Sequence, residues 1–308
     1  MKLIIQIPCY NEAGTLALAL KELPRKVDGF DTVEWLIIND GSEDDTVNVA
    51  NDCGVDHIVS FKTNQGLAKG FLAGISECIK LGADVIVNTD ADNQYEAKDI
   101  PKLVKPILDG KAEYVIGERP ISTTDHFSPI KKLLQKFGSY VVRKASKTNI
   151  PDAPSGFRAI SRECAIQLNV YNGYTYTLET IIQAGRKNIP ITSVPIRTNE
   201  DLRPSRLFSS IPEYVKRSIF TIIRISVVYK PFKVFSSIAA ILVFFGLCLG
   251  FRFLYYYIIG DGDGHVQSVI LSGLLVGLGF QTFLVAFLAD IIAVNRTLLE
   301  QIKAELKK

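Results

Sequence analysis

Two long uncharged runs in the C-terminal third constrain this 308-residue chain more than any other feature. Residues 234–251 carry no charge, and the apolar character resumes after Arg252 as far as residue 259. Residues 266–289 form a second uncharged run, and a short polar turn separates the two. Each run is long enough to cross about 30 Å of hydrocarbon as a helix. The sequence therefore predicts membrane spans at about 234–259 and 266–289, joined as a hairpin within residues 234–294. The alternative is a buried helical pair in a soluble protein.

Basic residues predict how this hairpin is oriented. Lys230 and Lys233 precede the first run, whereas the turn at 260–265 has no lysine or arginine. Four basic residues follow the second run: Arg296, Lys303, Lys307 and Lys308. Because loops rich in lysine and arginine stay in the cytoplasm, both ends of the chain are expected there. We expect an integral membrane protein, in the inner membrane if the source is bacterial, with a basic cytoplasmic tail at 295–308.

Composition excludes several classes of protein. A net charge of +3 is too small to indicate nucleic-acid binding. The five cysteines are odd in number, and no two have C-x-x-C spacing. This pattern indicates reduced thiols and neither a disulfide framework nor a zinc site. The N-terminal apolar run, residues 3–7, ends at Pro8 and is too short to predict a signal peptide.

Strand and helix patterns alternate through the first 200 residues. Short β-branched runs predict strands at 3–7, 35–39, 57–61, 84–89, 114–117 and 191–196. Helical patterns occupy 13–26, 44–52, 67–81, 100–109, 130–147 and 177–187. This order is typical of an α/β fold with a doubly wound, mostly parallel sheet. Ligands bind such sheets at the carboxyl ends of the strands.

The polar residues that follow one predicted strand suggest a metal site. Asp90, Ala91, Asp92 and Gln94 come directly after the strand at 84–89. Their side-chain oxygens suit Mg²⁺ or Mn²⁺, and an ion held by one or two carboxylates keeps positions free for phosphates. A site for a nucleoside diphosphate is therefore expected. The alternative is an acidic turn before the helix that starts near residue 97.

Other strand ends carry polar residues suited to a nucleoside. Pro8, Tyr10 and Glu12 follow the first strand, with Tyr10 able to stack on a base. Asp40 follows the second and is placed to bind a base or ribose, while Asp44 can cap the next helix. Ordinary turn chemistry is the alternative for each cluster. The segment 64–70, which includes Lys69, matches neither a P-loop nor a dinucleotide fingerprint.

The segment 208–233 joins the two halves of the chain. Apolar residues recur there at helical spacing, with basic residues between them. This pattern predicts an amphipathic helix lying in the anionic cytoplasmic leaflet of the membrane. The alternative is a linker helix packed on the core.

Taken in order, six short motifs resemble family 2 glycosyltransferases of GT-A fold, a Rossmann-like architecture. The resemblance is closest to dolichyl-phosphate mannose synthase and bacterial polyprenyl-phosphate glycosyltransferases. Each motif is weak alone, and the ordered set is specific. The motifs are Ile7-Pro8-Cys9-Tyr10-Asn11-Glu12, Asn39-Asp40-Gly41-Ser42, Asp90-Ala91-Asp92-Asn93-Gln94, Gly117-Glu118-Arg119, Ser155-Gly156-Phe157-Arg158 and Arg203-Pro204-Ser205-Arg206-Leu207.

The resemblance implies a GT-A catalytic domain at 1–207 that takes a UDP- or GDP-sugar as donor. Its donor-binding residues would be Pro8, Tyr10, Glu12, Asp40, Lys69, Asp90, Ala91, Arg203, Ser205 and Arg206. The Mg²⁺ or Mn²⁺ ligands would be Asp90, Asp92 and Gln94. The residues Arg203 to Arg206 fall on the family's flexible phosphate-binding loop, although Pro204 replaces its glycine.

The expected acceptor is a membrane polyprenyl phosphate, undecaprenyl or dolichyl. Such a phosphate is already anionic, so it can attack the anomeric carbon without a strong base and invert its configuration. Asp92 would help to stabilise the departing diphosphate, and Arg119 would face the phosphates of the donor or of the lipid acceptor. Asp152 would orient acceptor or sugar unless it is only a turn residue. Arg158 is either structural or close to the phosphate, and Glu179 either contacts sugar hydroxyls or is an ordinary helix residue.

Some alternatives stay open at this point. A polysaccharide synthase would carry Q-x-x-R-W, and Trp35 is the only tryptophan, so that motif is absent. Two alternatives remain. The chain is either a glycosyltransferase that uses another lipid as acceptor or a membrane scaffold without catalytic activity. The expected partners are the nucleotide-sugar donor, the polyprenyl phosphate acceptor and membrane lipid. The sequence is also compatible with a homo-oligomer.

Overall fold

A computed structural model describes residues 1–120, 138–140, 142–170, 176–199, 220, 223–224 and 227–306. The chain divides into two compact units. One comprises Met1–Ile219 with Ala304–Lys308, and the other comprises Phe220–Lys303. Each unit is described by itself.

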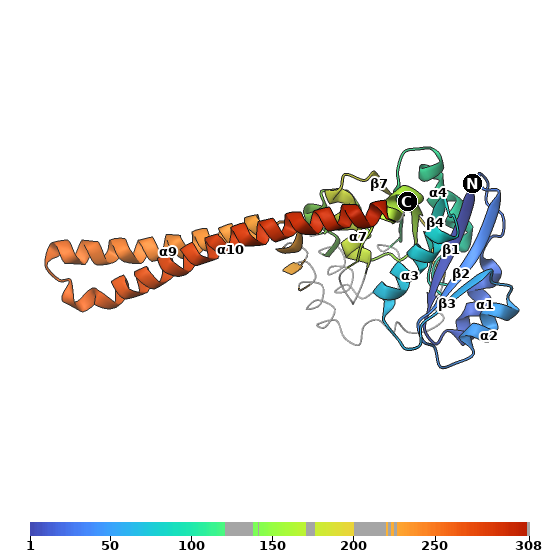
Figure 1. Ribbon diagram of the computed structural model, residues 1–308, viewed down its shortest axis with the longest axis horizontal. Helices are drawn as coiled ribbons and strands as arrows, with labels where there is room; N and C mark the ends of the chain where they lie inside the picture. The colour runs from blue at the N-terminus through green and yellow to red at the C-terminus, as the bar shows by residue number, and fades with distance from the viewer. Residues whose placement is uncertain are drawn as a thin grey trace. The chain divides into compact units, whose positions relative to one another are not determined.

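The first unit is built on a seven-stranded sheet with the order β3-β2-β1-β4-β6-β5-β7 (Figure 1). Neighbouring strands pair in parallel except β6, which runs antiparallel to both β4 and β5. The sheet is therefore mostly parallel, as the sequence predicts. The strands are β1 (Lys2–Cys9), β2 (Thr32–Asn39), β3 (His57–Ser60), β4 (Val85–Asn88), β5 (Tyr114–Glu118), β6 (Arg158–Ser161) and β7 (Ile191–Pro195).

Helices cover both faces of this sheet (Figure 1). The helices are α1 (Ala13–Glu22), α2 (Thr46–Asp52), α3 (Leu67–Lys80), α4 (Ile100–Leu108), α6 (Arg162–Gln167) and α7 (Thr177–Arg186), with a 3-10 turn, η1, at Ala97–Asp99. Alternate strand residues such as Ile5 and Ile37 pack into one core with Leu16 of α1 and Leu103 of α4. The intervening residues face α3, where Gly74 packs against β1 and β2.

Most predicted elements are present, and one altered boundary has a clear cause. The predicted helix at 13–26 ends at Glu22 because Leu23, which precedes Pro24, takes an extended conformation. The sequence predicts neither β6 nor α6. Strand β6 begins with the fully buried Arg158, a residue type that ordinarily indicates surface. Helix α6 has only six residues. Of the predicted helix at 130–147, residues 138–140 and 142–146 are described and helical.

The second unit contains α9 (Pro231–Ile259), a 3-10 turn, η2 (Asp263–His265), and α10 (Val266–Glu305). Both long helices are apolar enough to be candidate membrane spans. Helix α10 continues without a break as far as Glu305, into the segment 295–308 that the sequence assigns to a tail. Most of the predicted linker helix lies outside the described residues.

Small residues allow α9 and α10 to pack closely. A Cβ at Gly246 would lie 2.8 Å from Val276 Cγ2, and one at Gly279 would lie 2.6 Å from Val243 Cγ2. Two other glycines of α10, Gly273 and Gly277, have nothing within 4 Å of such an atom. Gly279 therefore lies at the described contact between these helices, whereas Gly273 and Gly277 do not.

Candidate active site

The parallel strands bring the predicted polar clusters to one edge of the sheet. The carboxyl ends of β1 and β2 lie side by side, with Cys9 paired to Asn39. Strand β4 pairs with the other side of β1, placing Asn88 opposite Gln6. Because β6 is antiparallel, its first residue, Arg158, lies at this edge too, opposite Asn88 and Ile116. The segments that follow the four strands β1, β2, β4 and β5 can therefore form one site.

The loops after β1 and β2 are cross-linked by hydrogen bonds. The backbone N–H of Asn11 donates to the hydroxyl of Ser42 at 2.9 Å, and Asn11 Oδ1 accepts from the backbone of Glu43 at 2.8 Å. Asp44 accepts from the backbone N–H groups of Ala13 at 3.0 Å and Thr46 at 3.1 Å. One carboxylate thus serves the starts of α1 and α2, where unpaired N–H groups favour negative charge.

These loops place the predicted nucleoside-binding residues in different surroundings. Tyr10 is exposed, as a base-stacking ring would need to be. Glu12 is buried, and its carboxylate accepts from the Thr15 hydroxyl at 2.9 Å. Pro8 lies within β1 and is partly buried. The three residues are contiguous with the edge described above, and their contact with a nucleoside stays a prediction.

Asp40 is buried and organises the loop that leads into α3. Its Oδ1 accepts from the Gln65 N–H at 2.6 Å, and its Oδ2 accepts from the Gly66 N–H at 2.8 Å. Each carboxylate oxygen retains a lone pair that can accept from a ligand. Gly41 has φ +70°, and a Cβ there would lie 2.6 Å from the backbone of the same loop, so glycine is required. Lys69, on the first turn of α3, is exposed and donates to Gln65 Oε1 at 2.9 Å.

Asp90 and Asp92 lie on the turn after β4. Asp92 Oδ1 accepts from the backbone N–H of Gln94 at 3.2 Å, and Ala91 between the two acids is buried. Burial, and then the negative charge of Asp92, raises the pKa of the Asp90 carboxyl to about 7. Two carboxylates that repel each other in a poorly hydrated turn are suited to a divalent cation, which would favour the ionised form of both.

The described residues contain no group of three or more histidine, cysteine or acidic side chains able to hold a metal. Within the described residues, Asp90 and Asp92 are therefore the acidic pair that an ion at this turn would meet. That donor set fits Mg²⁺ or Mn²⁺, which bind readily through one or two carboxylates together with substrate phosphates. Gln94 is partly buried, and its side chain as a ligand stays a prediction.

Arg119 and Asp152 form a two-pronged ion pair beside this turn. Asp152 Oδ2 accepts from Arg119 Nε at 2.8 Å, and Oδ1 accepts from Nη2 at 3.0 Å. The Arg119 backbone N–H also donates to Oδ2, at 3.2 Å. Burial opposes the charge on Arg119, but Asp152 outweighs this effect and raises the pKa of the guanidinium. Within the described residues Nη1 makes no hydrogen bond, so this atom can donate to an anion.

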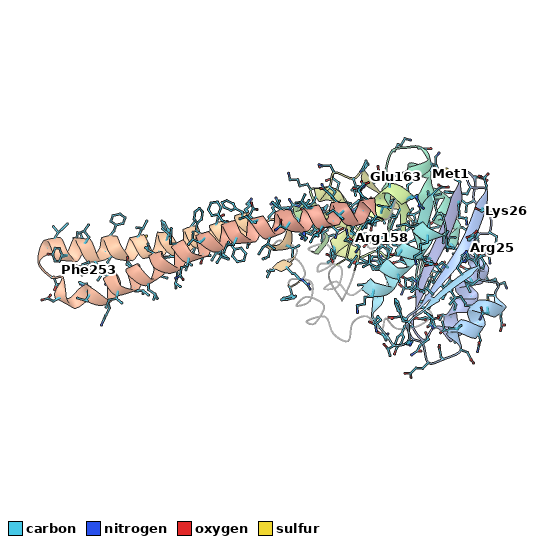
Figure 2. The ribbon with its side chains drawn as sticks, viewed as in Figure 1. Met1, Arg25, Lys26, Arg158, Glu163 and Phe253 are labelled. Atoms are coloured by element: carbon cyan, nitrogen blue, oxygen red, sulfur yellow. The ribbon has the colours of Figure 1, made fainter. Side chains whose placement is uncertain are left out.

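Within the described residues, Arg158 has a structural role. Its side chain is fully buried in the unit that carries the sheet (Figure 2). The guanidinium donates to the backbone carbonyls of Ser155, Ala153 and Thr177 and to the hydroxyls of Tyr114 and Thr180. A buried charge requires such hydrogen bonds. Arg158 thereby fixes the loop that carries Asp152, instead of offering its donors to a ligand.

Several expectations concern other parts of the chain. Glu179 is buried in α7, and its contact with sugar stays a prediction. Arg203, Ser205 and Arg206 lie outside the described residues.

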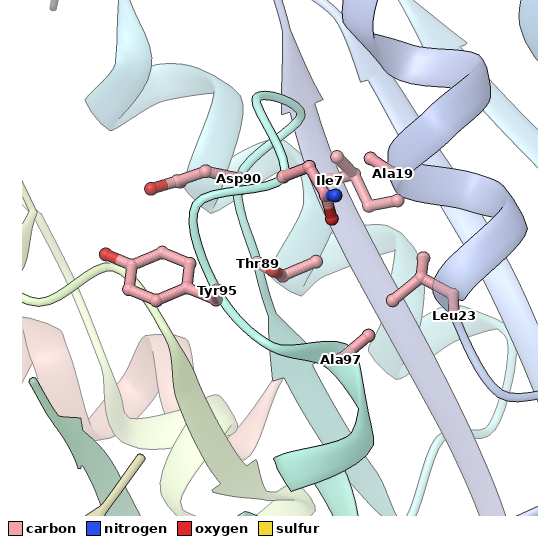
Figure 3. Close-up of a pocket in the computed structure, with 8 residues that line it drawn as sticks. Ile7, Ala19, Leu23, Thr89, Asp90, Tyr95 and Ala97 are labelled. Carbon is pink, nitrogen blue, oxygen red and sulfur yellow. The ribbon is translucent and has the colours of Figure 1, made fainter. Parts of the chain in front are cut away.

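The Asp90 turn also borders a small pocket, lined by residues from β1, α1 and the segment 89–97 (Figure 3). Its lining combines the apolar residues Ile7, Ala19, Leu23 and Ala97 with the polar residues Thr89, Asp90, Asn93 and Tyr95. Asp90 and Tyr95 extend their polar ends to the same side of the turn, away from Ala19 and Leu23 (Figure 3). These two polar groups thus face the side of the turn opposite α1.

Sequence reasoning missed three residues that fix this turn. Tyr95 and Gly156 share a hydrogen bond of 2.9 Å, and Asn88 donates to the Gly156 carbonyl at 2.9 Å. Gly156 belongs to a motif already noted, but its partners are more than sixty residues away in the chain. Asn88, a polar residue at the end of an apolar strand, was the one local signal.

Comparisons with known proteins agree with this architecture. The model of the family described as glycosyl transferase family 2 matches residues 4–168, more than half of the chain. An undecaprenyl-phosphate mannosyltransferase from Micrococcus luteus is 29% identical over 207 residues, covering 64% of this chain and 83% of that protein. Glycosyltransferase AglJ from Haloferax volcanii is 26% identical over 298 residues, covering 94% of this chain and 92% of the relative.

A solved structure supports the fold alone. Glucosyl-3-phosphoglycerate synthase from Mycobacterium tuberculosis, in complex with Mn²⁺, UDP and glucosyl-3-phosphoglycerate, superimposes with a TM-score of 0.57 at 18% identity. The match covers 72% of this chain and 79% of that one. The mostly parallel sheet is thus of the GT-A type, with two apolar helices following it. On the match to its family model, the chain belongs to glycosyl transferase family 2.

Proposed function

We propose that this protein transfers a sugar from a nucleoside-diphosphate sugar to a polyprenyl phosphate in a membrane. The observation that carries the proposal is the pair of acidic residues, Asp90 and Asp92, at the carboxyl edge of a GT-A sheet in a chain with two membrane-length helices. Relatives named as an undecaprenyl-phosphate mannosyltransferase and as a UDP-N-acetylglucosamine–dolichyl-phosphate N-acetylglucosaminyltransferase, from Methanococcus voltae, support this acceptor class.

The reaction is a single displacement at the anomeric carbon. An oxygen of the lipid phosphate forms a bond to that carbon while the bond to the nucleoside diphosphate breaks, so the configuration inverts. A phosphate is anionic at neutral pH and needs no strong base. The residues therefore act chiefly on the departing diphosphate, whose developing charge is best stabilised by groups fixed in advance.

Named residues divide this task. Tyr10, Glu12 and Asp40 bind the UDP or GDP portion of the donor. Mg²⁺ or Mn²⁺ held by Asp90 and Asp92 would neutralise charge on the leaving diphosphate. Arg119, oriented by Asp152, donates from Nη1 to a phosphate oxygen. Arg203 and Arg206 supply further positive charge for the same phosphates.

The second part of the proposal is that the helical hairpin anchors the protein in the membrane. Helices α9 and α10 cross the membrane, with the basic flanks and the catalytic unit on the cytoplasmic side. Anchoring at the membrane raises the effective concentration of a lipid acceptor. In a bacterial cell this is the inner membrane.

The test is transfer of radiolabelled sugar by the full chain in detergent or lipid. A panel of UDP- and GDP-sugars is offered with undecaprenyl phosphate and, separately, with undecaprenol. We expect labelled lipid only with the phosphate, because the alcohol lacks the charge that arginine binds and is a poor nucleophile. Equal use of the alcohol would refute this acceptor. If the protein hydrolyses none of the donors in the panel, the result would support a catalytically silent scaffold.

A further inference from the structure

Gly156 lies directly against the carboxylate of Asp90. A Cβ built on Gly156 would lie 2.9 Å from Asp90 Oδ2 and 3.1 Å from Oδ1. Both distances are shorter than an ordinary van der Waals contact. The backbone of Gly156 does not have a positive φ, so its conformation does not require glycine. The constraint at this position is space beside one carboxylate.

The peptide groups of Gly156 are held from both sides of the acidic turn. Its N–H donates to Tyr95 Oη at 2.9 Å, and its carbonyl accepts from Asn88 Nδ2 at 2.9 Å. Asn88 and Tyr95 flank Asp90 and Asp92 in the chain. Gly156, Asn88 and Tyr95 are buried, and the Tyr95 ring stacks on Phe157 with centroids 5.1 Å apart. Gly156 therefore cannot move away from Asp90 without breaking buried hydrogen bonds.

The anchors are themselves fixed. Asn88 Oδ1 accepts from Gln6 Nε2 at 2.8 Å, and Asn88 Nδ2 also donates to Tyr176 Oη at 2.9 Å. The Tyr176 ring stacks on Phe71 of α3 with centroids 3.9 Å apart. This network reaches from the Asp90 turn to α3 and α7. It gives Gly156 a rigid support.

Asp90 lacks the usual means of fixing a carboxylate. Within the described residues it accepts no hydrogen bond, whereas Asp92 accepts from Gln94. A side chain with no such bond is oriented by its packing. Gly156 packs directly against its oxygen atoms.

We propose that Gly156 is a positioning residue, whose missing side chain sets the orientation of the Asp90 carboxylate for a divalent cation. The inference rests on the proposed function, because it assumes that Asp90 binds the cation of a nucleotide-sugar site. A side chain at position 156 displaces the Asp90 carboxylate, which is the most easily moved partner. We expect that displacement to weaken metal binding more than it lowers the stability of the fold.

The test compares Gly156→Ala with Gly14→Ala in the full chain. Gly14 is a matched control, since a Cβ there meets nothing within 4 Å. Binding of Mn²⁺ in the presence of UDP and, separately, of GDP is measured by calorimetry and by the electron paramagnetic resonance of free Mn²⁺. Gly156→Ala should weaken Mn²⁺ binding by about tenfold to a hundredfold, the range for residues that orient a metal ligand. Gly14→Ala should bind as the wild type does, and equal binding by both variants would overturn the proposal.

A second measurement needs no metal. The thermal midpoint is determined for the wild type, Gly156→Ala, Asp90→Ala and the double variant, without divalent ions. If the methyl group added by Gly156→Ala contacts the Asp90 carboxylate, the loss that it causes is smaller in the Asp90→Ala background. The same loss in both backgrounds would contradict a direct contact.

Tyr95→Phe provides a further variant should Gly156→Ala fail to fold. It removes the hydroxyl that accepts from Gly156 and leaves Asp90 unchanged, so Mn²⁺ binding should again weaken. Unchanged binding would count against the proposal. Failure of the wild type to bind Mn²⁺ with either UDP or GDP would refute the proposed function instead, and the metal-free comparison would still decide whether Gly156 positions Asp90.

Discussion

Asp152 holds the guanidinium of Arg119 through two parallel hydrogen bonds, 2.8 Å from Oδ2 to Nε and 3.0 Å from Oδ1 to Nη2. The Asp152 side chain is 1% exposed and that of Arg119 is 17% exposed. The pair leaves Nη1 as the guanidinium nitrogen available to an anion within the described residues. Asp152 is thereby suited to acting through Arg119, whereas the sequence alone left a direct role in the chemistry open.

This pairing predicts that Asp152 and Arg119 act as one unit. Asp152→Asn should lower turnover because an amide cannot accept from both guanidinium nitrogens. Arg119→Lys should lower it because lysine lacks the planar fork. The double variant should lose little more activity than either single variant, as interacting residues are not additive. Sugar transfer by the three variants checks this expectation, and multiplied losses would show that the two residues act independently.

The acidic turn predicts metal dependence. Asp92→Asn removes one charge from the proposed ion site and should reduce turnover by at least about two orders of magnitude, a loss typical of removing electrostatic stabilisation. The fold should survive, because Asp92 is only partly buried. Turnover is measured with added Mg²⁺ or Mn²⁺ and with chelator. Near-normal turnover in the variant, or full wild-type activity in chelator, would remove Asp92 from the site.

A buried aspartate away from the site predicts a pH-dependent stability. Burial disfavours the charge on Asp99, but hydrogen bonds from Arg197 and Lys102 outweigh this and hold the pKa of the carboxyl at about 2. The unfolded chain has an aspartate pKa of about 3.9. Because the folded pKa is the lower one, the stabilisation is complete above about pH 4 and is lost as the pH falls towards 2.

Asp99→Asn should therefore lower the stability by about 2 kcal/mol at pH 7 and by much less near pH 2. Thermal midpoints of the variant and the wild type, measured from pH 7 downwards, give the difference at each pH. Asp109→Asn is the control, since Asp109 pairs with Lys105 and Lys111 at the surface, where such pairs contribute little. A constant difference for Asp99→Asn across this range would contradict the role of ionisation.

The sequence predicted the sheet better than it predicted the support of the site. Strands such as β1 and β2 are apolar and β-branched, so local pattern was sufficient. Strand β6 was missed because Arg158 is buried. Its guanidinium donates hydrogen bonds to residues that are distant in the sequence. No local pattern reveals that a charged side chain will find such acceptors.

The same distinction applies to the site. Asp90 and Asp92 could be predicted because both acids follow one strand. The contact between Asp90 and Gly156 could not, because it depends on β6 returning antiparallel beside β4. The pairing of Asp152 with Arg119 also joins residues far apart in sequence. Local pattern located the carboxylates, and only the fold shows what orients them.

The basic flanks predict the topology of the hairpin. Cysteine replacing Asp261 should react with an impermeant thiol reagent from outside intact cells, whereas cysteine replacing Lys303 should react only after permeabilisation. Burial raises the pKa of Cys9, Cys78 and Cys164, so these thiols should stay unreactive. Only Cys53 and Cys248 need replacing beforehand. The reverse labelling pattern would place the catalytic unit outside the cell, where nucleotide sugars are scarce.

The contact between α9 and α10 predicts that two neighbouring glycines differ in importance. A side chain at Gly279 would meet Val243 Cγ2 at 2.6 Å and the Ala239 carbonyl at 3.1 Å, whereas Gly277 has nothing within 4 Å. Gly279→Leu should separate the helices, because close packing of backbones favours their association in lipid. Gly277→Leu adds the same apolar side chain in open space and should leave the pair intact.

Spin labels at Ile241 and Leu288, both exposed, can report this separation. The distance between the labels should increase or broaden in Gly279→Leu and stay as in the wild type in Gly277→Leu. Since both variants add equal hydrophobicity, a difference between them must come from the contact and not from membrane affinity. Equal distances in all three proteins would mean that the close approach at Gly279 does not hold the hairpin together.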